Sequence, residues 1–396
     1  MKSTLKGKAV RAAAGFAATA LMVGAAVMGG NPAGADPKQF SALRGVGSDT
    51  TQDVVNAFAG FTNNVNYTPL QSSTASSKRQ IASFDAVLTG SDCITTTAGG
   101  ASFLRPNGST NGRKALSRAI DGGTWPLSTA LCGGVKAVSG QIDFARSSAG
   151  PGSGTPLVLT YIPFGRDGLG FAYYASSGTP TTTLTSAQLT SLFSTGPQTI
   201  GSIEVVPCGI QTGSGTFGSW NTALGITATQ EGVGTATCNA AGTGARLQEN
   251  DAAGLKAKGD AQPGKEVIVG FSAANFISQT NGVAASQLPP GQPATFIVDL
   301  GAIDALGKPY TGSAPGPIAP SATYYASTTF GRDVYNVVPS AKLGGLASVN
   351  ADFKTMFVGA GSAVCQATAT ITAFGFSTAT VLPCGDTSLQ GPSIAN

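Results

Sequence analysis

Residues 183–196 read TLTSAQLTSLFSTG, a stretch that predicts one amphipathic helix with a marked beginning and end. Thr185 and Gln188 have the S/T-x-x-Q spacing of a capping box, which begins a helix. Apolar residues then recur on one face of that helix: Leu189, Leu192 and Phe193. Gly196 and the proline after it end the helix. A predicted strand and a glycine-rich turn follow in 203–220, and this order of elements indicates an α/β fold.

Other apolar runs predict buried strands at 142–145, 157–164, 170–174, 203–206, 266–271 and 335–338. Between the second and third of these, GRDG at 165–168 predicts a turn. The Pro/Gly-rich segment 289–320 predicts a long surface excursion, and 355–388 predicts a C-terminal unit closed by a disulfide. Trp125 and Trp220 are expected in the core. No long linker or repeat stands out.

The first 35 residues predict a cleaved secretory signal peptide. Four cations come first (Lys2, Lys6, Lys8 and Arg11), the apolar run 12–28 follows, and 33–35 form an A-x-A cleavage pattern. The run is rich in Ala and Gly, so a retained membrane anchor is the weaker interpretation. The first cysteine is Cys93, which argues against a lipid anchor. We therefore expect free secretion, with no membrane anchor.

After removal of the predicted signal peptide, the charge and length of the remaining chain indicate its class. The leader carries four of the 23 Lys and Arg residues and none of the 19 Asp and Glu residues, so the remainder is close to neutral. A neutral chain gives no argument for nucleic-acid binding. Only 11% of all residues are charged, against roughly 25% in an average domain. Some 360 residues exceed one ordinary core, which indicates two lobes.

The cysteines and the missing histidine limit which metal sites and catalytic centres the protein could have. An even number of cysteines in an exported chain favours disulfides. Their spacing predicts the pairs Cys93–Cys132, Cys208–Cys238 and Cys365–Cys384. No C-x-x-C occurs, so we expect no metal site. The chain has no histidine, which excludes Ser-His-Asp and Cys-His catalytic centres. We expect no enzymatic activity and no cofactor.

Three polar turns carry the predicted binding chemistry. Each follows a strand-like run or opens a helix, and their candidate residues are Ser48, Asp49 and Thr50, then Arg146, Ser147 and Ser148, then Ser214, Gly215 and Thr216. Backbone N–H groups at a helix N-terminus carry partial positive charge, and Ser and Thr hydroxyls add donors. Facing turns of this kind would cradle an oxyanion without a metal. Asp49 could instead cap a helix together with Gln52.

The chain resembles the phosphate-binding, type II periplasmic-binding-protein family of ABC uptake systems. The resemblance rests on GVGSDTT, IDFARSS, TLTSAQLTSLFSTG, QTGSGTFGSW and EVIVGFSAANF, which occur in this order within about 42–340. It implies two α/β lobes joined by two crossing strands, the first lobe from 36–164 and 275–396 and the second from 165–274. It also implies anion contacts at the Ser, Gly and Thr positions of the three turns, and an ABC permease as a partner.

Two departures from that family concern the charges at the ligand. The family has an arginine shortly before the third turn, where this chain has Ile210 and Gln211. It also has an aspartate in the second turn, where Ser148 stands. Arg146 could supply the cation, with Asp143 as its structural partner, and Asp49 could supply the acceptor.

The leading hypothesis is a secreted, monomeric solute-binding protein that closes on a small oxyanion, phosphate first. A sulfate-like anion or a carboxylate is the alternative ligand. A second hypothesis is a secreted or wall-associated interaction protein that kept the fold without transporting a ligand. A phosphatase-like enzyme is disfavoured by the missing histidine.

Overall fold

The computed structural model describes residues 36–37, 42–73, 78–88, 90–240, 246–284, 298–313, 317–344 and 348–394. The predicted signal peptide at 1–35 lies outside these residues. No helix in the described ranges is long and apolar enough to cross a membrane.

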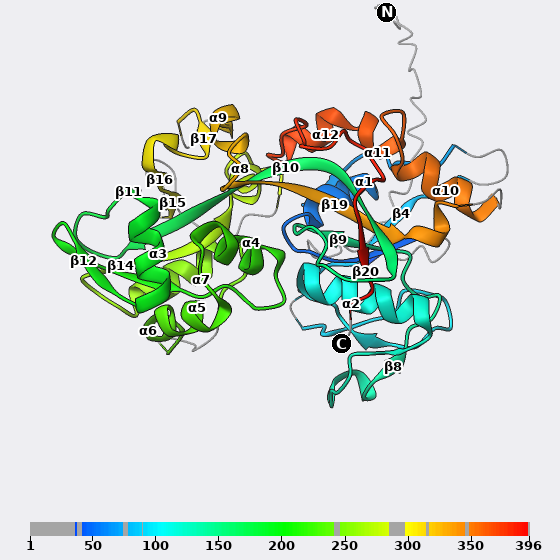
Figure 1. The fold of residues 1–396 in the computed structure, drawn as a ribbon, viewed down its shortest axis with the longest axis horizontal. Coiled ribbons are helices and arrows are strands. Elements are labelled where there is room, and N and C mark those ends of the chain that lie inside the picture. Colours follow the sequence, from blue (N-terminus) through cyan, green and yellow to red (C-terminus); the bar gives the residue numbers. More distant parts are fainter. Residues whose placement is uncertain are drawn as a thin grey trace, which may run out of the picture. The chain divides into compact units, whose positions relative to one another are not determined.

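A mixed sheet organises the described chain (Figure 1). Its strands lie in the order β12 (Gln198–Ile200), β13 (Ile203–Cys208), β14 (Lys265–Ser272), β10 (Leu157–Ala175), β19 (Gly331–Pro339), β9 (Phe144–Ser147), β1 (Leu43–Gly47) and β4 (Ile81–Ser83). Two short strands, β15 (Asp299–Leu300) and β20 (Gln390–Pro392), also pair with β10. The strands 203–206, 266–271 and 335–338 are confirmed within β13, β14 and β19.

Strand β10 runs through both halves of the sheet. It pairs with β14 over 169–175 and with β19 over 159–168, both antiparallel. The predicted turn at 165–168 is therefore wrong, because this stretch continues the strand with a register shift between Pro163 and Gly165. Its glycines and charged residues resemble a turn, but each of these residues faces a partner on β19.

The paired stretches contain the same tripeptide, Gly-Arg-Asp, at 165–167 and 331–333. In the antiparallel register Arg166 lies opposite Asp333, and Asp167 lies opposite Arg332. Each opposite pair is a salt bridge, with N···O distances of 2.7 Å and 2.8 Å. Since successive residues of a strand point to opposite faces, one bridge lies on each face of the crossing strands.

Helices cover the sheet in two groups. The part of the sheet formed by β9, β1 and β4 carries α1 (Gln52–Phe58), α2 (Gly108–Asp121), α10 (Ser348–Phe357), α11 (Ala363–Gln366) and α12 (Thr368–Ala373). Around β12, β13 and β14 lie α3 (Ser186–Thr195), α4 (Gly215–Leu224), α5 (Ala228–Gly234), α6 (Ala236–Ala240) and α7 (Ala252–Asp260), as Figure 1 shows. Two more, α8 (Ala273–Thr280) and α9 (Ala322–Tyr325), contact β10. The capping box that Thr185 and Gln188 predict for α3 is confirmed.

Short elements complete the fold. The two-stranded sheets consist of β2 (Phe61–Thr62) with β3 (Val65–Asn66), β5 (Cys93–Ile94) with β6 (Phe103–Leu104), β7 (Thr124–Trp125) with β8 (Lys136–Ala137), β11 (Thr183–Leu184) with β16 (Ala302–Ile303), and β17 (Tyr310–Thr311) with β18 (Ala319–Pro320). Three 3₁₀ turns span Leu131–Gly133, Asp304–Leu306 and Ser340–Lys342. Trp125 and Trp220 are buried, as predicted.

The buried apolar residues form separate clusters on the two sides of the crossing strands. One cluster takes residues from 169–277 and from 298–330. Two others take residues from 42–164 and 334–376, together with Ala274 and Ala284. The mixed α/β class, the two crossing strands and the disulfide near the C-terminus confirm the predicted fold class. The division of the chain at 164 and 274 stays a prediction.

Packing differs from expectation in 289–320. Residues 285–297 and 314–316 lie outside the described residues, but Val298, Leu300 and Ile303 are fully buried. They pack in the first cluster because β15 pairs with β10. For this described part the predicted surface excursion is wrong, and we propose that 298–330 belongs with the second lobe.

The three disulfides pair as the cysteine spacing predicts: Cys93–Cys132, Cys208–Cys238 and Cys365–Cys384. No free cysteine occurs among the described residues.

Candidate functional site

Hydroxyl groups from all three predicted turns meet in one buried cluster. The Oγ of Ser148 lies 3.3 Å from the Oγ of Ser48 and 3.3 Å from the Oγ1 of Thr50. The Oγ1 of Thr50 lies 3.4 Å from the Oγ1 of Thr216. All four residues are buried, although up to 168 positions separate them in the sequence. Each turn therefore contributes at least one hydroxyl to the same place.

The third turn is shaped by the start of α4. Ser214 caps this helix, and its Oγ accepts the backbone N–H groups of Thr216 and Phe217 at 2.9 Å and 3.4 Å. The Ser214 hydroxyl is thus engaged by the helix end. Gly215 needs to be glycine here, because a Cβ atom would lie 2.6 Å from the hydroxyls of both Ser109 and Ser148.

Ser109, at the start of α2, joins the cluster and was not predicted. The backbone N–H of Ser148 donates to the Ser109 Oγ at 3.0 Å, and the two hydroxyls are 3.1 Å apart. The neighbouring N–H of Thr110 donates to the carbonyl of Gly213 at 3.0 Å. The N-terminus of α2 therefore meets the turn that opens α4. The polar Asn-Gly-Ser run at 107–109, where α2 begins, is the sequence signal that could have identified Ser109.

Arg332 supplies the cation of the site. Its guanidinium donates to the Oγ1 of Thr216 at 2.7 Å and to the Oγ1 of Thr50 at 3.4 Å. It also donates to the carbonyl of Ser148 at 3.2 Å and to the Oδ2 of Asp167 at 2.8 Å and 3.2 Å. One guanidinium thus contacts all three turns and is held by the salt bridge of the crossing strands. Sequence reasoning missed it, although the repeated Gly-Arg-Asp was a signal.

The prediction that Arg146 supplies this cation is wrong. Its guanidinium is fully buried beneath the first turn and donates to five oxygens: the carbonyls of Gly45, Gly47, Ser48 and Phe84 and the Oγ of Ser83. These five bonds use all five N–H groups of the guanidinium and fix the loop after β1. Burial lowers the pKa of Arg146 to about 10. Its expected partner Asp143 forms a salt bridge with Arg44 instead.

Ser147 also points away from the cluster. It is the last residue of β9, and its Oγ donates to the carbonyl of Ala149 at 2.7 Å. The geometry is that of a local turn closed by a side chain. Its neighbour Ser148 is the one residue of this predicted pair whose hydroxyl contacts the other turns.

Asp49 does not cap α1, so the capping prediction is wrong. The cap position is Thr51, and the Gln52 side chain accepts the N–H of Ala86 instead. Both carboxyl oxygens of Asp49 are buried, with no hydrogen-bond partner among the described residues. Burial first, and then the nearby negative charge of Glu249, raise the pKa of Asp49 well above its ordinary value.

Glu249 is a second buried carboxylate at the site and was not predicted. Its Oε1 accepts the Thr50 hydroxyl at 2.7 Å, whereas its Oε2 has no partner among the described residues. Because burial and the charge of Glu249 both disfavour the ionised form of the Asp49 carboxyl, we expect Asp49 to hold a proton. The site therefore combines donors with acceptors.

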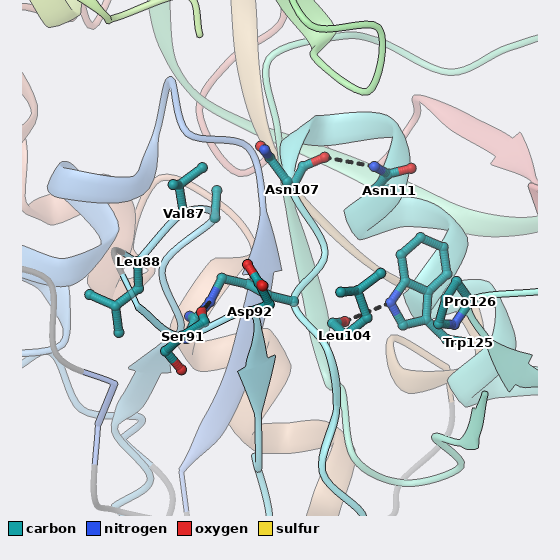
Figure 2. Close-up of a pocket in the computed structure, with 11 residues that line it drawn as sticks. Val87, Leu88, Ser91, Asp92, Leu104, Asn107, Asn111, Trp125 and Pro126 are labelled. Atoms are coloured by element: carbon teal, nitrogen blue, oxygen red, sulfur yellow. Dashed lines mark hydrogen bonds between the residues drawn. The ribbon is translucent and has the colours of Figure 1, made fainter. Parts of the chain in front are cut away.

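A cavity of about 370 Å³ lies beside the start of α2 (Figure 2). Its apolar wall is formed by Val87, Leu88, Leu104, Trp125 and Pro126. The indole N–H of Trp125 donates to the carbonyl of Leu104, and Asn111 donates to the carbonyl of Asn107. None of the predicted site residues lines this cavity. Among the described residues no group of three or more Asp, Glu, Cys or His side chains could hold a metal ion.

Comparison with known proteins gives similar solved structures. No family model matches the chain, and no curated protein matches it. An ABC-type phosphate transport receptor from Vibrio cholerae is 15% identical with a TM-score of 0.43, over 85% of this chain and 99% of that one. A phosphate-binding protein from Stenotrophomonas maltophilia is 15% identical with a TM-score of 0.39, over 86% and 91%. Their descriptions name the family that the sequence resembles.

Proposed function

We propose that the protein is a secreted, monomeric solute-binding protein that closes on a small oxyanion, phosphate first. One observation carries this proposal: three distant turns converge on the guanidinium of Arg332, through the hydroxyls of Thr50 and Thr216 and the carbonyl of Ser148. Convergent neutral donors around one cation are what a desolvated oxyanion requires. The helices α2 and α4 begin beside this cluster and add the positive ends of their dipoles.

Each group has a role in the proposed complex. Arg332 neutralises the anion, and the hydroxyls of Ser48, Thr50, Ser148 and Thr216 replace its hydration shell. Asp49 and Glu249 accept hydrogens that a protonated anion carries, so a phosphate retains partners for its O–H groups. The four predicted residues that remain act around the ligand: Gly215 allows close approach, and Arg146, Ser147 and Ser214 hold the turns.

In the present structure the hydroxyls bond one another and Glu249, and binding exchanges these contacts for contacts with the anion. Thr50 lies in the turn before α1 and Thr216 lies in α4, on different sides of the crossing strands. We propose that ligand exchange accompanies a hinge motion of β10 and β19. The partner that receives the ligand would be an ABC permease. No enzymatic step is part of this proposal.

Titration calorimetry with phosphate, arsenate, sulfate and acetate tests the function. We expect heat with phosphate and arsenate. Thr216→Val should weaken that binding because it removes a hydroxyl that contacts Arg332. Thr222→Val on the same helix is the matched control, since its exposed hydroxyl bonds only the carbonyl of Gly218 among the described residues. A folded sample without heat for any anion would overturn the proposal.

A second candidate is an interaction protein that kept the fold without a ligand. It is favoured by hydrogen bonds that the site makes within itself: Thr50 donates to Glu249, and the Thr110 N–H donates to the carbonyl of Gly213. Under this hypothesis no anion binds, and Glu249→Gln leaves the anion response at zero. Turnover of a chromogenic phosphate ester would contradict both candidates.

A further inference from the structure

A second cavity, of about 400 Å³, borders the site on the side of the crossing strands. Ser148 and Arg332 line it, so two groups of the proposed anion site also form its wall. The other side chains used below are those of Ser219, Thr328, Tyr335, Val381, Leu382 and Leu389. The last three belong to the C-terminal region, to which the sequence assigned no role.

Its size exceeds what an inorganic anion needs. A tetrahedral oxyanion has five heavy atoms and takes the space of two or three water molecules, roughly 60–90 Å³ at about 30 Å³ per water. Cavities of about 300–1,000 Å³ are typical of sites for organic ligands. The cavity beside Arg332 therefore has room for an organic group attached to the anion.

The cavity continues from the anion site along α4. Ser219 follows Thr216 by three residues, and residues three apart lie on the same face of a helix. Arg332 borders both places, because one end of its guanidinium contacts Thr216 and Thr50 while another N–H reaches the carbonyl of Ser148. A ligand whose anion lies at Thr216 can therefore extend past Arg332 towards Ser219.

The charged groups in the cavity wall are already paired. Arg166 donates to Asp333 and to the carbonyls of Tyr325 and Ser327. The second oxygen of Asp333 accepts the backbone N–H of Val381. Arg332 is paired with Asp167. Apart from Arg332, which the proposed function assigns to the anion, the charges of this wall (Arg166 and Asp333) are paired with each other, so the organic group that fits here is neutral.

Hydroxyls and apolar groups complete the lining. The hydroxyls of Ser219, Thr328 and Tyr335 form no hydrogen bond with any other described residue. They can donate to and accept from hydroxyl groups of a ligand. Val381 is 74% exposed at the cavity, and the bond from its N–H to Asp333 and the Cys365–Cys384 disulfide hold this segment in place. Together with Leu382 it offers contact to carbon atoms.

From these observations we propose that the oxyanion is the terminal group of a small organic molecule whose organic part is neutral and hydroxylated, a phosphate monoester or a phosphonate. Its organic part lies in the cavity between Ser219, Tyr335 and the C-terminal segment 381–389. This inference rests on the proposed function, because it places the oxyanion at Arg332.

Titration calorimetry of the full protein with inorganic phosphate, glycerol 3-phosphate and glycerol tests the inference. We expect glycerol 3-phosphate to bind about tenfold more tightly than inorganic phosphate and glycerol not to bind, since the cavity adds hydrogen bonds only to a ligand that the anion anchors. The double variant Ser219→Ala/Tyr335→Phe should lose this advantage while its affinity for inorganic phosphate stays unchanged. Thr222→Val is the control on α4.

The outcomes separate the two proposals. Inorganic phosphate that binds as well as or better than the ester overturns the inference and leaves the proposed function standing. An advantage of the ester that survives in the double variant also overturns it, because the organic group then lies elsewhere. If neither anion binds to the folded protein, the proposed function fails and the inference fails with it.

Discussion

Replacing Arg332 with methionine should destabilise the protein strongly, because it leaves a buried carboxylate without its cation. The guanidinium makes five hydrogen bonds, of which two at 2.8 Å and 3.2 Å reach the Oδ2 of Asp167. Asp167 has no exposed side-chain surface, and its Oδ1 keeps only the backbone N–H of Ala274 among the described donors. Methionine fills a comparable apolar volume and supplies no donor.

The expected loss is about 3–5 kcal/mol of unfolding free energy, the usual cost of removing one partner from a buried ion pair. Urea unfolding at constant pH measures it, with the slope checked for equal exposure of surface. Arg118→Met is the matched control. Its salt bridge with Asp121 lies at the surface, where the Asp121 side chain is 43% exposed, so the loss should stay below about 1 kcal/mol.

A second substitution tests the cause. In Arg332→Met/Asp167→Asn the buried charge is gone, and most of the lost stability should return because an amide costs less to bury unpaired than a carboxylate does. If Arg332→Met costs less than about 1 kcal/mol, or if the double variant is no more stable than the single one, the reasoning about the crossing strands is wrong.

Two further substitutions test the site itself. Asp49 holds its proton in the folded state at a pH where the unfolded chain has lost it, so its contribution to stability is complete below about pH 4 and falls as the pH rises towards the raised folded pKa. The unfolding free energy of Asp49→Asn should therefore rise relative to the wild type by up to about 1.4 kcal/mol per pH unit as the pH increases above about 4, and parallel urea midpoints would contradict this. Gly215→Ala should weaken phosphate binding at least about tenfold, because its Cβ would meet two hydroxyls at 2.6 Å. Gly218→Ala on the same helix has open space around it and should bind normally and gain about 0.5–1 kcal/mol of stability.

Local signals in the sequence predicted the elements that depend on local chemistry. The Thr185 side chain accepts the backbone N–H of Gln188, and the Gln188 side chain accepts the backbone N–H of Thr185. The four residues 185–188 therefore suffice to define the start of α3. The glycine-rich turn before α4 is likewise a local feature. Cysteine pairs 19 to 39 residues apart were predictable because each pair closes a segment of modest length.

The charged residues were predictable only in part, since their role depends on burial and on distant partners. Arg146 lies at the end of a predicted strand and Arg332 shortly before one, and neither position shows in the sequence what the guanidinium contacts. Carbonyls enclose Arg146, whereas Arg332 donates to the hydroxyls of Thr50 and Thr216 and to the carbonyl of Ser148. Glu249 stands in a polar segment with no helix or strand signal. Nothing within a few residues of Glu249 indicates that its carboxylate meets Thr50, 199 positions away.

The Gly-Arg-Asp repeat connects the fold to the site. Because β10 and β19 are antiparallel, two copies of one tripeptide place each arginine opposite an aspartate. On one face the bridge between Arg166 and Asp333 is enclosed by carbonyls and by the N–H of Val381. On the other face Arg332 extends to Thr50, in the turn before α1, and to Thr216 in α4, which lie on different sides of the crossing strands. A change in how these strands bend must therefore change the contacts of the same guanidinium that we propose holds the anion.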